Sequence, residues 1–283
     1  MPGCVIAGVK INMECEYPYL LQRMEAFASE SHKKPEITIT AIKTEFIEEP
    51  DGDAFIDDGH LVWLKRKEPE GYYLFQSDKI THRITVLMEV DTLWRQVSIS
   101  YTTDDPAFIY NPFFMAGIVF RNYLLQQGGM VIHASSIAYQ DRGILFTAPS
   151  GTGKSTHVRL WEQYLGSEVT VLNDDTPALR FLGEKLYLYG TPWSGSTQKY
   201  HNGSVPLKAI ILLEQAQKNT IRQLSVKEAL PRLMPRFFLP YFDDKMMGNA
   251  YDFIEKLLQT TPIYQLACRP DKEAMELAYH HIV

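Results

Sequence analysis

The first third of the chain alternates apolar and polar residues in the way that half-buried strands do. The alternation is clearest in the runs 37–42 and 97–101, and turn-forming clusters such as residues 49–52 separate such runs. This pattern predicts a strand-rich region with strands at Val5–Asn12, Ile37–Ile47, Leu61–Lys65, Tyr72–Gln76, Ile80–Val90 and Trp94–Tyr101.

The pattern changes after residue 111, where a helix is predicted over Phe113–Leu125, ended by two glycines. Strands and helices then mix, with strands predicted at Met130–Tyr139, Ile144–Thr147, Val169–Leu172, Ala178–Phe181, Lys185–Tyr189 and Ala209–Leu213. Helices are predicted at Lys154–Leu165 and near 226–235, 249–259 and 271–281. We therefore predict an α+β or α/β protein of two domains, residues 1–110 and 111–283.

Composition adds few constraints. Apolar residues make up 45% and charged residues 22% of the 283, which is ordinary for a globular protein. The short apolar run at 5–9 is too brief for a signal sequence, and no run is long enough to span a membrane. The three cysteines Cys4, Cys15 and Cys268 have neither disulfide nor zinc-site spacing. We expect a cytoplasmic protein without a membrane partner.

The charge is divided unevenly along the chain. Residues 1–110 carry 11 basic and 19 acidic side chains (11 − 19 = −8), whereas residues 111–283 carry 17 and 15 (17 − 15 = +2). The total of −6 and the lack of basic runs argue against a nucleic-acid partner. We expect an anionic ligand to bind the second part; a basic or leader-peptide partner for the acidic first part is a hypothesis.

A glycine-containing loop joins the predicted strand 144–147 to the predicted helix 154–165. Its sequence, Ala-Pro-Ser-Gly-Thr-Gly-Lys-Ser at 148–155, fits the phosphate-binding P-loop, with alanine in place of the first glycine. Such a loop turns backbone N–H groups toward phosphate oxygens, its lysine reaches the β and γ phosphates, and its serine hydroxyl binds Mg²⁺. The alternative is a glycine-rich connection with an exposed lysine. We expect the nucleotide to bind Ser150, Gly151, Thr152, Gly153, Lys154, Ser155 and Thr156, with Ser155 on the metal.

An apolar strand that ends in two carboxylates follows about 20 residues after Lys154. The run 169–172 leads into Asn173, Asp174 and Asp175, as in a Walker B strand that delivers an aspartate to Mg²⁺. One carboxylate can hold the metal, directly or through water, while the other accepts a proton from an attacking hydroxyl. The alternative is a turn capped by an aspartate side chain.

Further candidates are less specific. His133 is predicted to lie on a strand, where a single histidine is either structural or functional. The segment 191–196 contains Trp193 and fits either a substrate-contacting loop or a tight turn with the ring packed inside. Phosphoryl transfer favours one more cation beside Lys154 and Mg²⁺. Its candidates are Lys199, Arg232 and Arg236.

Three stretches together resemble a known family. His133-Ala-Ser-Ser, the P-loop segment 143–155 and Leu172-Asn-Asp-Asp are similar to the catalytic domain of bacterial HPr kinase/phosphorylase and, more distantly, to the nucleotide domain of phosphoenolpyruvate carboxykinase. This resemblance covers about residues 130–190. The segments 190–195 and 205–214 also resemble the lasso peptide kinases, HPr-kinase-like proteins that phosphorylate a serine of a precursor peptide. The resemblance to these kinases implies a P-loop kinase domain preceded by a strand-rich domain.

The resemblance also implies roles for individual residues. Lys154 would contact the nucleotide phosphates, His133 would lie near the reacting phosphoryl group, and Asp174 and Asp175 would be metal ligand and general base, in that order. The chain departs from HPr kinases in Ala148 and in the absence of their Glu-Ile-Arg-Gly signature. For these reasons the resemblance does not extend to HPr as substrate or to the reverse reaction.

These observations favour an ATP- and Mg²⁺-dependent kinase that acts on a Ser or Thr hydroxyl of a peptide or small protein. A kinase of small metabolites and a nucleotide-binding regulator without turnover are the alternatives. A GTPase is disfavoured because no Asn-Lys-x-Asp motif is present. No catalytic residue is assigned to residues 1–110, and the oligomeric state stays open.

Overall fold

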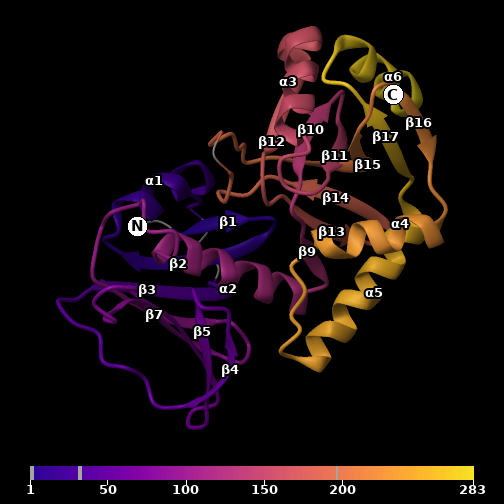
Figure 1. The fold of residues 1–283 in the computed structure, drawn as a ribbon. Coiled ribbons are helices and arrows are strands. Elements are labelled where there is room, and N and C mark those ends of the chain that lie inside the picture. The colour runs from indigo at the N-terminus through magenta and orange to yellow at the C-terminus, as the bar shows by residue number, and fades with distance from the viewer. Residues whose placement is uncertain (1–2, 31–33, 196) are drawn as a thin grey trace. The chain divides into compact units, whose positions relative to one another are not determined.

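The computed structural model describes residues 3–30, 34–195 and 197–283. The chain divides into two compact units, residues 1–126 and 127–283, each built on its own sheet (Figure 1). The described residues form two sheets and six α-helices, which confirms the predicted mixed α/β architecture. None of the helices in the described part of the chain is both long and apolar enough to cross a membrane.

The first unit contains an eight-stranded mixed sheet. Its strands follow the order β1-β2-β3-β8-β7-β6-β5-β4, with parallel pairing of β3 to β2 and to β8. They are β1 (Cys4–Ile6), β2 (Val9–Cys15), β3 (Ile37–Lys43), β4 (Asp53–Asp57), β5 (Val62–Arg66), β6 (Gly71–Ser77), β7 (Ile84–Asp91) and β8 (Gln96–Tyr101).

Three strands of this sheet differ from the sequence prediction. The single strand predicted over Val5–Asn12 is a hairpin, because Ala7 and Gly8 have positive φ angles of 48° and 80° and reverse the chain. β7 begins at Ile84 rather than Ile80, because the Asp78 carboxylate accepts hydrogen bonds from the backbone of residues 80 and 81 and holds a turn there. β4 was missed because two of its five residues are aspartates and none of the five is fully buried.

The helix α2 (Pro112–Gln126) groups with the first unit rather than the second. It contacts β8 and the short helix α1 (Pro18–Met24), which the sequence analysis did not predict. Eleven of its 15 residues are buried, so it behaves as an interior helix and not as the start of a separate unit. The compact first unit therefore extends to residue 126, beyond the predicted boundary at 110.

The second unit contains a nine-stranded sheet in the order β12-β10-β11-β15-β14-β13-β9, with β17 beside β15 and β16 beside β17. Its strands are β9 (Gly129–Val131), β10 (Ser135–Tyr139), β11 (Arg142–Thr147), β12 (Val169–Asn173), β13 (Ala178–Leu182), β14 (Lys185–Tyr189), β15 (Ser204–Gln215), β16 (Thr220–Gln223) and β17 (Ile263–Cys268). β16 and β17 pair with strands that are distant in sequence, and neither was predicted.

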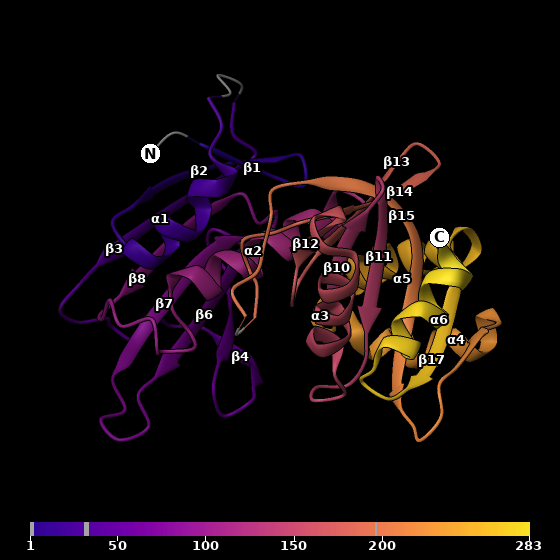
Figure 2. The same ribbon diagram turned by 90° about the horizontal axis from the view of Figure 1, so that it is seen from above.

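Helices lie on both faces of this sheet. Figure 2 shows α3 (Lys154–Leu165) and α6 (Lys272–Ile282) on one face and α5 (Asp244–Thr260), which contacts β9, on the other; α4 (Val226–Leu233) contacts α5. Phe146, Trp161 and Ile211 are fully buried in the core between the sheet and the pair α3 and α6. This packing fixes α3 along its length while its N-terminus lies at the end of β11.

Strand directions bring the residues of the sequence motifs to one edge of the sheet. β11 and β12 both pair antiparallel to β10, and β15 and β17 run parallel to β11. The carboxyl ends of β11, β12, β15 and β17 and the amino end of β10 therefore share one edge of the sheet. Segments that follow or precede these ends are placed side by side although they are far apart in sequence.

Candidate active site

The P-loop connects β11 to α3 at this edge. Gly151 and Gly153 have φ angles of 75° and 114°, which residues with a Cβ rarely adopt, and Gly153 is the N-cap of α3. Ala148 is buried and is not among the residues with positive φ, so an alanine fits where many P-loops have glycine. The nest of backbone N–H groups predicted from the glycines is thus compatible with the backbone that the loop adopts.

His133 lies at a break between two strands rather than on one continuous strand. The predicted strand over 130–139 divides into β9, which pairs with β13, and β10, which pairs with β11 and β12. At the break the backbone N–H of His133 donates to the carbonyl of Arg236 (2.7 Å), that of Ala134 donates to the carbonyl of Asp175 (2.9 Å), and the Thr147 hydroxyl donates to the His133 carbonyl (2.8 Å). These bonds satisfy the backbone where the chain changes partners and fix the histidine.

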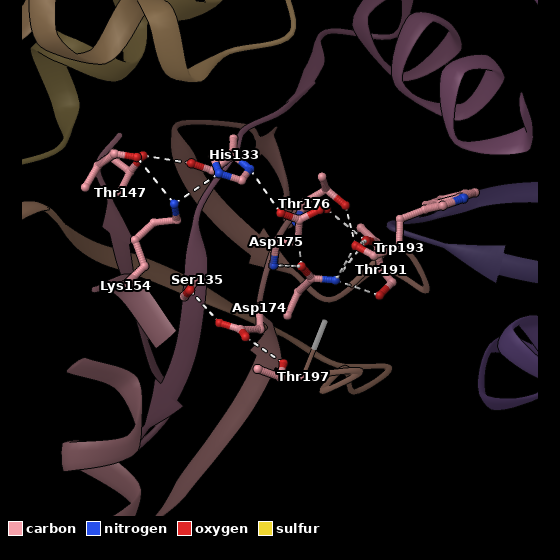
Figure 3. Close-up of polar contacts among 12 residues, drawn as sticks. His133, Ser135, Thr147, Lys154, Asp174, Asp175, Thr176, Thr191, Trp193 and Thr197 are labelled. Atoms are coloured by element: carbon pink, nitrogen blue, oxygen red, sulfur yellow. Dashed lines mark hydrogen bonds and ion pairs between the residues drawn. The ribbon is translucent and has the colours of Figure 1, made fainter. Parts of the chain in front are cut away.

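The side chain of His133 joins the P-loop lysine to one aspartate (Figure 3). Its Nε2 lies 3.0 Å from the Nζ of Lys154, and its Nδ1 lies 3.0 Å from Oδ1 of Asp175. The histidine and the aspartate are each about one-third exposed, at 33% and 34% of their side chains. A chain of contacts thus runs from the lysine through the imidazole to the carboxylate, and it can be reached from solvent.

The partners of the imidazole define its protonation. The Lys154 ammonium has only donors, so the facing Nε2 must accept, whereas the carboxylate of Asp175 accepts a proton from Nδ1. Of the two tautomers, the one that carries its proton on Nδ1 fits both contacts. In this form the histidine orients both charged neighbours without adding positive charge of its own.

The lysine is held in a partly desolvated position. Burial lowers the pKa of Lys154 below its ordinary value, the positive charge of Arg236 lowers it further, and the charges of Asp175 and Asp174 act in the opposite direction. Its Nζ also lies 3.4 Å from the Ala148 carbonyl oxygen. The ammonium is thus placed at the start of the P-loop between acidic groups and one arginine.

Asp174 is positioned differently from its neighbour. Its residue is buried, its Oδ1 accepts a hydrogen bond from Ser135 (2.5 Å) and its Oδ2 accepts one from Thr197 (2.6 Å). A carboxylate can accept about four hydrogen bonds, so each oxygen keeps one further position. The orientation of Asp174 is therefore fixed, whereas Asp175 is the more exposed carboxylate.

Asn173 organises the backbone around the Asp pair and was not identified from the sequence. It is fully buried, and its Oδ1 accepts from the backbone N–H groups of Asp175 (2.8 Å) and Thr176 (2.6 Å). Its Nδ2 donates to the carbonyls of Thr191 (2.8 Å) and Trp193 (3.0 Å). One side chain thereby ties the turn after β12 to the segment that begins at residue 191.

Residues 191–195 and 197–200 lie against the Asp pair. Thr197 bonds Asp174, and a Cβ added to Gly195 would lie only 3.4 Å from the Cβ of Asp175. Trp193 is partly buried, and Ser196 lies outside the described residues. The contacts agree with the interpretation of this segment as a loop beside the site.

The remaining predicted nucleotide residues follow the backbone of the loop. Ser150 and Gly151 are exposed, and Thr152, Ser155 and Thr156 are partly buried in the loop and the first turn of α3. In the described part of the chain no hydrogen bond joins the Ser155 hydroxyl to the Asp pair. Their roles in binding phosphate and metal stay predictions.

The donor set fits Mg²⁺ better than a softer metal. The oxygens near the P-loop are those of Ser155 and the two aspartates, and Mg²⁺ prefers a few such oxygens completed by water and substrate phosphates. No group of three or more His, Cys, Asp or Glu residues suited to a metal occurs in the described chain. The residues are therefore compatible with Mg²⁺ held together with a nucleotide.

The three candidate cations differ in their surroundings. Lys199 bonds both carboxylate oxygens of Glu162 at 2.7 Å, and Arg232 lies 3.8 Å from a carboxylate oxygen of Glu214. Arg236 instead follows α4, accepts the His133 backbone hydrogen bond and acts electrostatically on Lys154. Both Arg232 and Arg236 line a cavity of about 300 Å³ with the first residues of the P-loop, but only Arg236 also has these two links to His133 and Lys154. Of the three, Arg236 is the one placed beside the site.

Residues 98–268 match the family described as SynChlorMet cassette protein ScmC. The chain belongs to this family. The matched segment contains His133, the P-loop, the Asp pair and Arg236. The ScmC description names a cassette protein and states no reaction.

Other comparisons add little. No curated protein matches the sequence. Among solved structures the chain is similar to the Hpr(Ser) kinase/phosphatase from Coxiella burnetii, with 11% identity over 53% of this chain and 95% of that one, at a TM-score of 0.31. A similarity this low does not establish a shared fold. The resemblance to HPr kinases and to lasso peptide kinases therefore stays a prediction from the sequence.

Proposed function

We propose that this ScmC protein is a kinase that transfers the γ-phosphoryl group of ATP to a Ser or Thr hydroxyl of a peptide or small protein. The observation that carries the proposal is the chain of contacts from Lys154 through His133 to Asp175, next to a P-loop. It combines a cation for phosphate oxygens with a carboxylate for the acceptor proton. The sequence resemblance to HPr-kinase-like proteins points to the same chemistry.

The proposed reaction needs little covalent work from the protein. The acceptor oxygen attacks the γ-phosphorus, the bond from that phosphorus to the ADP oxygen breaks, and the hydroxyl proton goes to Asp175. Positioning and charge stabilisation supply most of the catalysis in such transfers. When the nucleotide binds, the Lys154 ammonium would donate to the phosphates, because it has three N–H donors and the contact with His133 uses one of them.

The two aspartates would have different roles in the reaction. The Asp175 side chain is about one-third exposed, so an incoming hydroxyl can reach it. Asp174 is buried, with a hydroxyl donor on each oxygen, which suits a fixed negative charge on the metal side. Ser155 and Asp174 would hold Mg²⁺, whose charge would stabilise negative charge on the phosphates.

The acceptor would enter past the segment 191–200. Asn173 and Thr197 tie this segment to the Asp pair, and Trp193 is partly exposed on it. An aromatic side chain beside hydroxyl groups offers contacts that a peptide can use. The first unit, which is strongly acidic and carries no assigned catalytic group, would help to bind the acceptor.

Label transfer tests this proposal. The purified full chain is incubated with γ-³²P-ATP, Mg²⁺ and cell extract separated into peptide and small-molecule fractions, and the products are read by mass spectrometry. We expect phosphoserine or phosphothreonine in peptides. Label confined to small molecules would contradict the peptide acceptor, and bound ATP without any transfer would contradict the kinase and support a regulator.

A further inference from the structure

A cavity of about 670 Å³ borders the P-loop on the side away from the Asp pair. Its walls are P-loop and α3 residues, including Gly151, Gly153 and Thr156, and the segments 213–217 and 268–270, which end β15 and β17. Its volume lies within the range of about 300–1,000 Å³ usual for small-molecule sites. None of the residues assigned to phosphoryl transfer other than the P-loop itself lines it.

Strand order explains why this cavity and the Asp pair lie on opposite sides of the P-loop. β11 has β10 and then β12 on one side and β15 and then β17 on the other. The register pairs Thr147 with Leu212 and Gln215 with Cys268, so the parallel strands β11, β15 and β17 end at the same edge. Ligands of α/β sheets bind outside such carboxyl ends. A molecule whose phosphates lie in the P-loop can thus extend over β15 toward β17.

The charges of the cavity fit a neutral group better than a second phosphate. Arg269 is the cation among its lining residues, and its guanidinium bonds Asp271 at 2.9 Å and Glu273 at 3.0 Å. Glu214 adds a negative charge to the wall. Burial raises the pKa of the Cys268 thiol to about 11, so the thiol is uncharged at neutral pH.

The other groups that line the cavity are of the kinds that contact a flat heterocycle. Leu213, Ala216 and Pro270 offer apolar contact, and the paired guanidinium of Arg269 offers a planar face on which a ring can stack. Gln215 and Gln217 supply amide groups that can donate or accept hydrogen bonds. This mixture of apolar walls and a few polar groups is typical of sites for nucleobases and similar ligands.

We infer that this cavity binds the base and ribose of the nucleotide, while the P-loop holds its phosphates and the γ end faces Asp175. The inference rests on the proposed function and adds the site that reads the nucleoside. It requires that ATP bind more tightly than inorganic triphosphate, which can occupy the P-loop alone.

Calorimetric titration with Mg²⁺ separates the two parts of the ligand. Wild-type protein should bind ATP at least about tenfold more tightly than inorganic triphosphate, since burying a heterocycle contributes more than the 1.4 kcal/mol that a tenfold change needs. The variant Ala216→Trp fills the cavity and should lose this preference while keeping its affinity for triphosphate. Leu182→Trp, in an exposed hairpin of the same unit, is the matched control and should behave as wild type.

The outcomes are distinguishable. Equal affinity of the wild type for ATP and triphosphate, or an Ala216→Trp protein that keeps the preference for ATP, would overturn the nucleoside site but leave the proposed function standing. Binding of neither ligand by the wild type would overturn the proposed function, and this inference with it.

Thiol footprinting gives a second test that needs no substitution. Cys268 lines the cavity, whereas Cys15 belongs to the first unit and is also partly buried. With saturating ATP and Mg²⁺, alkylation of Cys268 should slow several-fold, whereas triphosphate should leave it unchanged and neither ligand should affect Cys15. Equal protection by triphosphate, or no protection by bound ATP, would contradict the inference. Mass spectrometry of the digested protein reads each cysteine separately.

Discussion

The two sides of β11 carry different chemistry at the same edge of the sheet. Toward β10 and β12, charged side chains contact one another, as in the chain from Lys154 through His133 to Asp175. Toward β15 and β17, a cavity of about 670 Å³ has its one arginine already paired with acidic residues. The P-loop lies between them. The difference fits the two proposals, with charge concentrated where the phosphoryl group would react and balanced where the nucleoside would bind.

This comparison predicts that substitutions on the two sides affect different measurements. Changes on the β10 and β12 side should reduce phosphoryl transfer, whereas changes on the β15 and β17 side should reduce the contribution of the nucleoside to binding. A residue between the two sides should affect transfer and phosphate binding together. Each prediction below either separates these effects or shows that they cannot be separated.

Lys154→Met should have the largest effect. Removing the cation that is proposed to contact the phosphates should lower phosphoryl transfer by about a thousandfold, the upper end for loss of one charge-stabilising donor, and should weaken binding of inorganic triphosphate. Lys208→Met, an exposed lysine on β15, is the control. Initial rates with γ-labelled ATP and calorimetry with triphosphate measure the two effects. Normal triphosphate affinity in Lys154→Met would remove this residue from the phosphate site.

Arg236→Gln should reduce transfer by about a hundredfold with little change in ATP affinity, because a cation beside the reacting phosphate acts mainly in the transition state. Lys199→Gln and Arg232→Gln are matched controls, since their charges are directed to Glu162 and Glu214. Steady-state kinetics on the three variants shows which substitution lowers the rate of transfer most. A larger loss in either control would show that the additional cation was assigned to the wrong residue.

The prediction for His157 concerns the stability of the folded protein rather than the rate of transfer. This histidine of α3 lines the cavity and packs on Phe146, and neither ring nitrogen has a hydrogen-bond partner among the described residues. Burial lowers its pKa to about 4 from 6.5. The unfolded chain therefore binds a proton first as pH falls, so stability from neutral His157 is complete above pH 6.5 and is lost toward pH 4.

Urea unfolding at pH 7.5 and pH 5 measures this effect. Between these values the wild type should lose about 2 kcal/mol more than His157→Leu, about thirtyfold in the folding equilibrium. His281→Gln changes an exposed histidine of α6 and should retain the wild-type loss. Equal losses in wild type and His157→Leu would show that the histidine is not buried in neutral form.

Much of the candidate site was predictable because its signals are local. The glycines and lysine of the P-loop and the apolar run before Asp174 identify elements from a few neighbouring residues, and α3 begins and ends at the residues predicted. The structure adds that His133 contacts both Lys154 and Asp175. Chain order alone could suggest these residues as a set but could not place the imidazole between them.

The parts that were missed depend on partners distant in sequence. Thr197 bonds Asp174 across 23 positions, and Asn173 bonds Thr191 and Trp193, which lie 18 and 20 positions away, so nothing in their local sequence marks them. β17 lacks clear alternation, and its parallel pairing with β15 makes it a strand. The boundary at 110 followed a change of pattern, whereas the packing of α2 on β8 extends the first unit.

The central claim is that Asp175 takes the proton of the acceptor hydroxyl, and Asp175→Asn tests it most directly. Two quantities are measured for each protein: the rate of transfer from γ-labelled ATP to the peptide acceptor at saturating ATP, and the affinity for ATP. The proteins are the wild type, Asp175→Asn and the control Asp252→Asn, which changes an exposed aspartate of α5. We predict that Asp175→Asn is about 10²- to 10³-fold slower with unchanged ATP affinity, while Asp252→Asn equals the wild type. Transfer by Asp175→Asn within a few-fold of the wild-type rate would contradict the account.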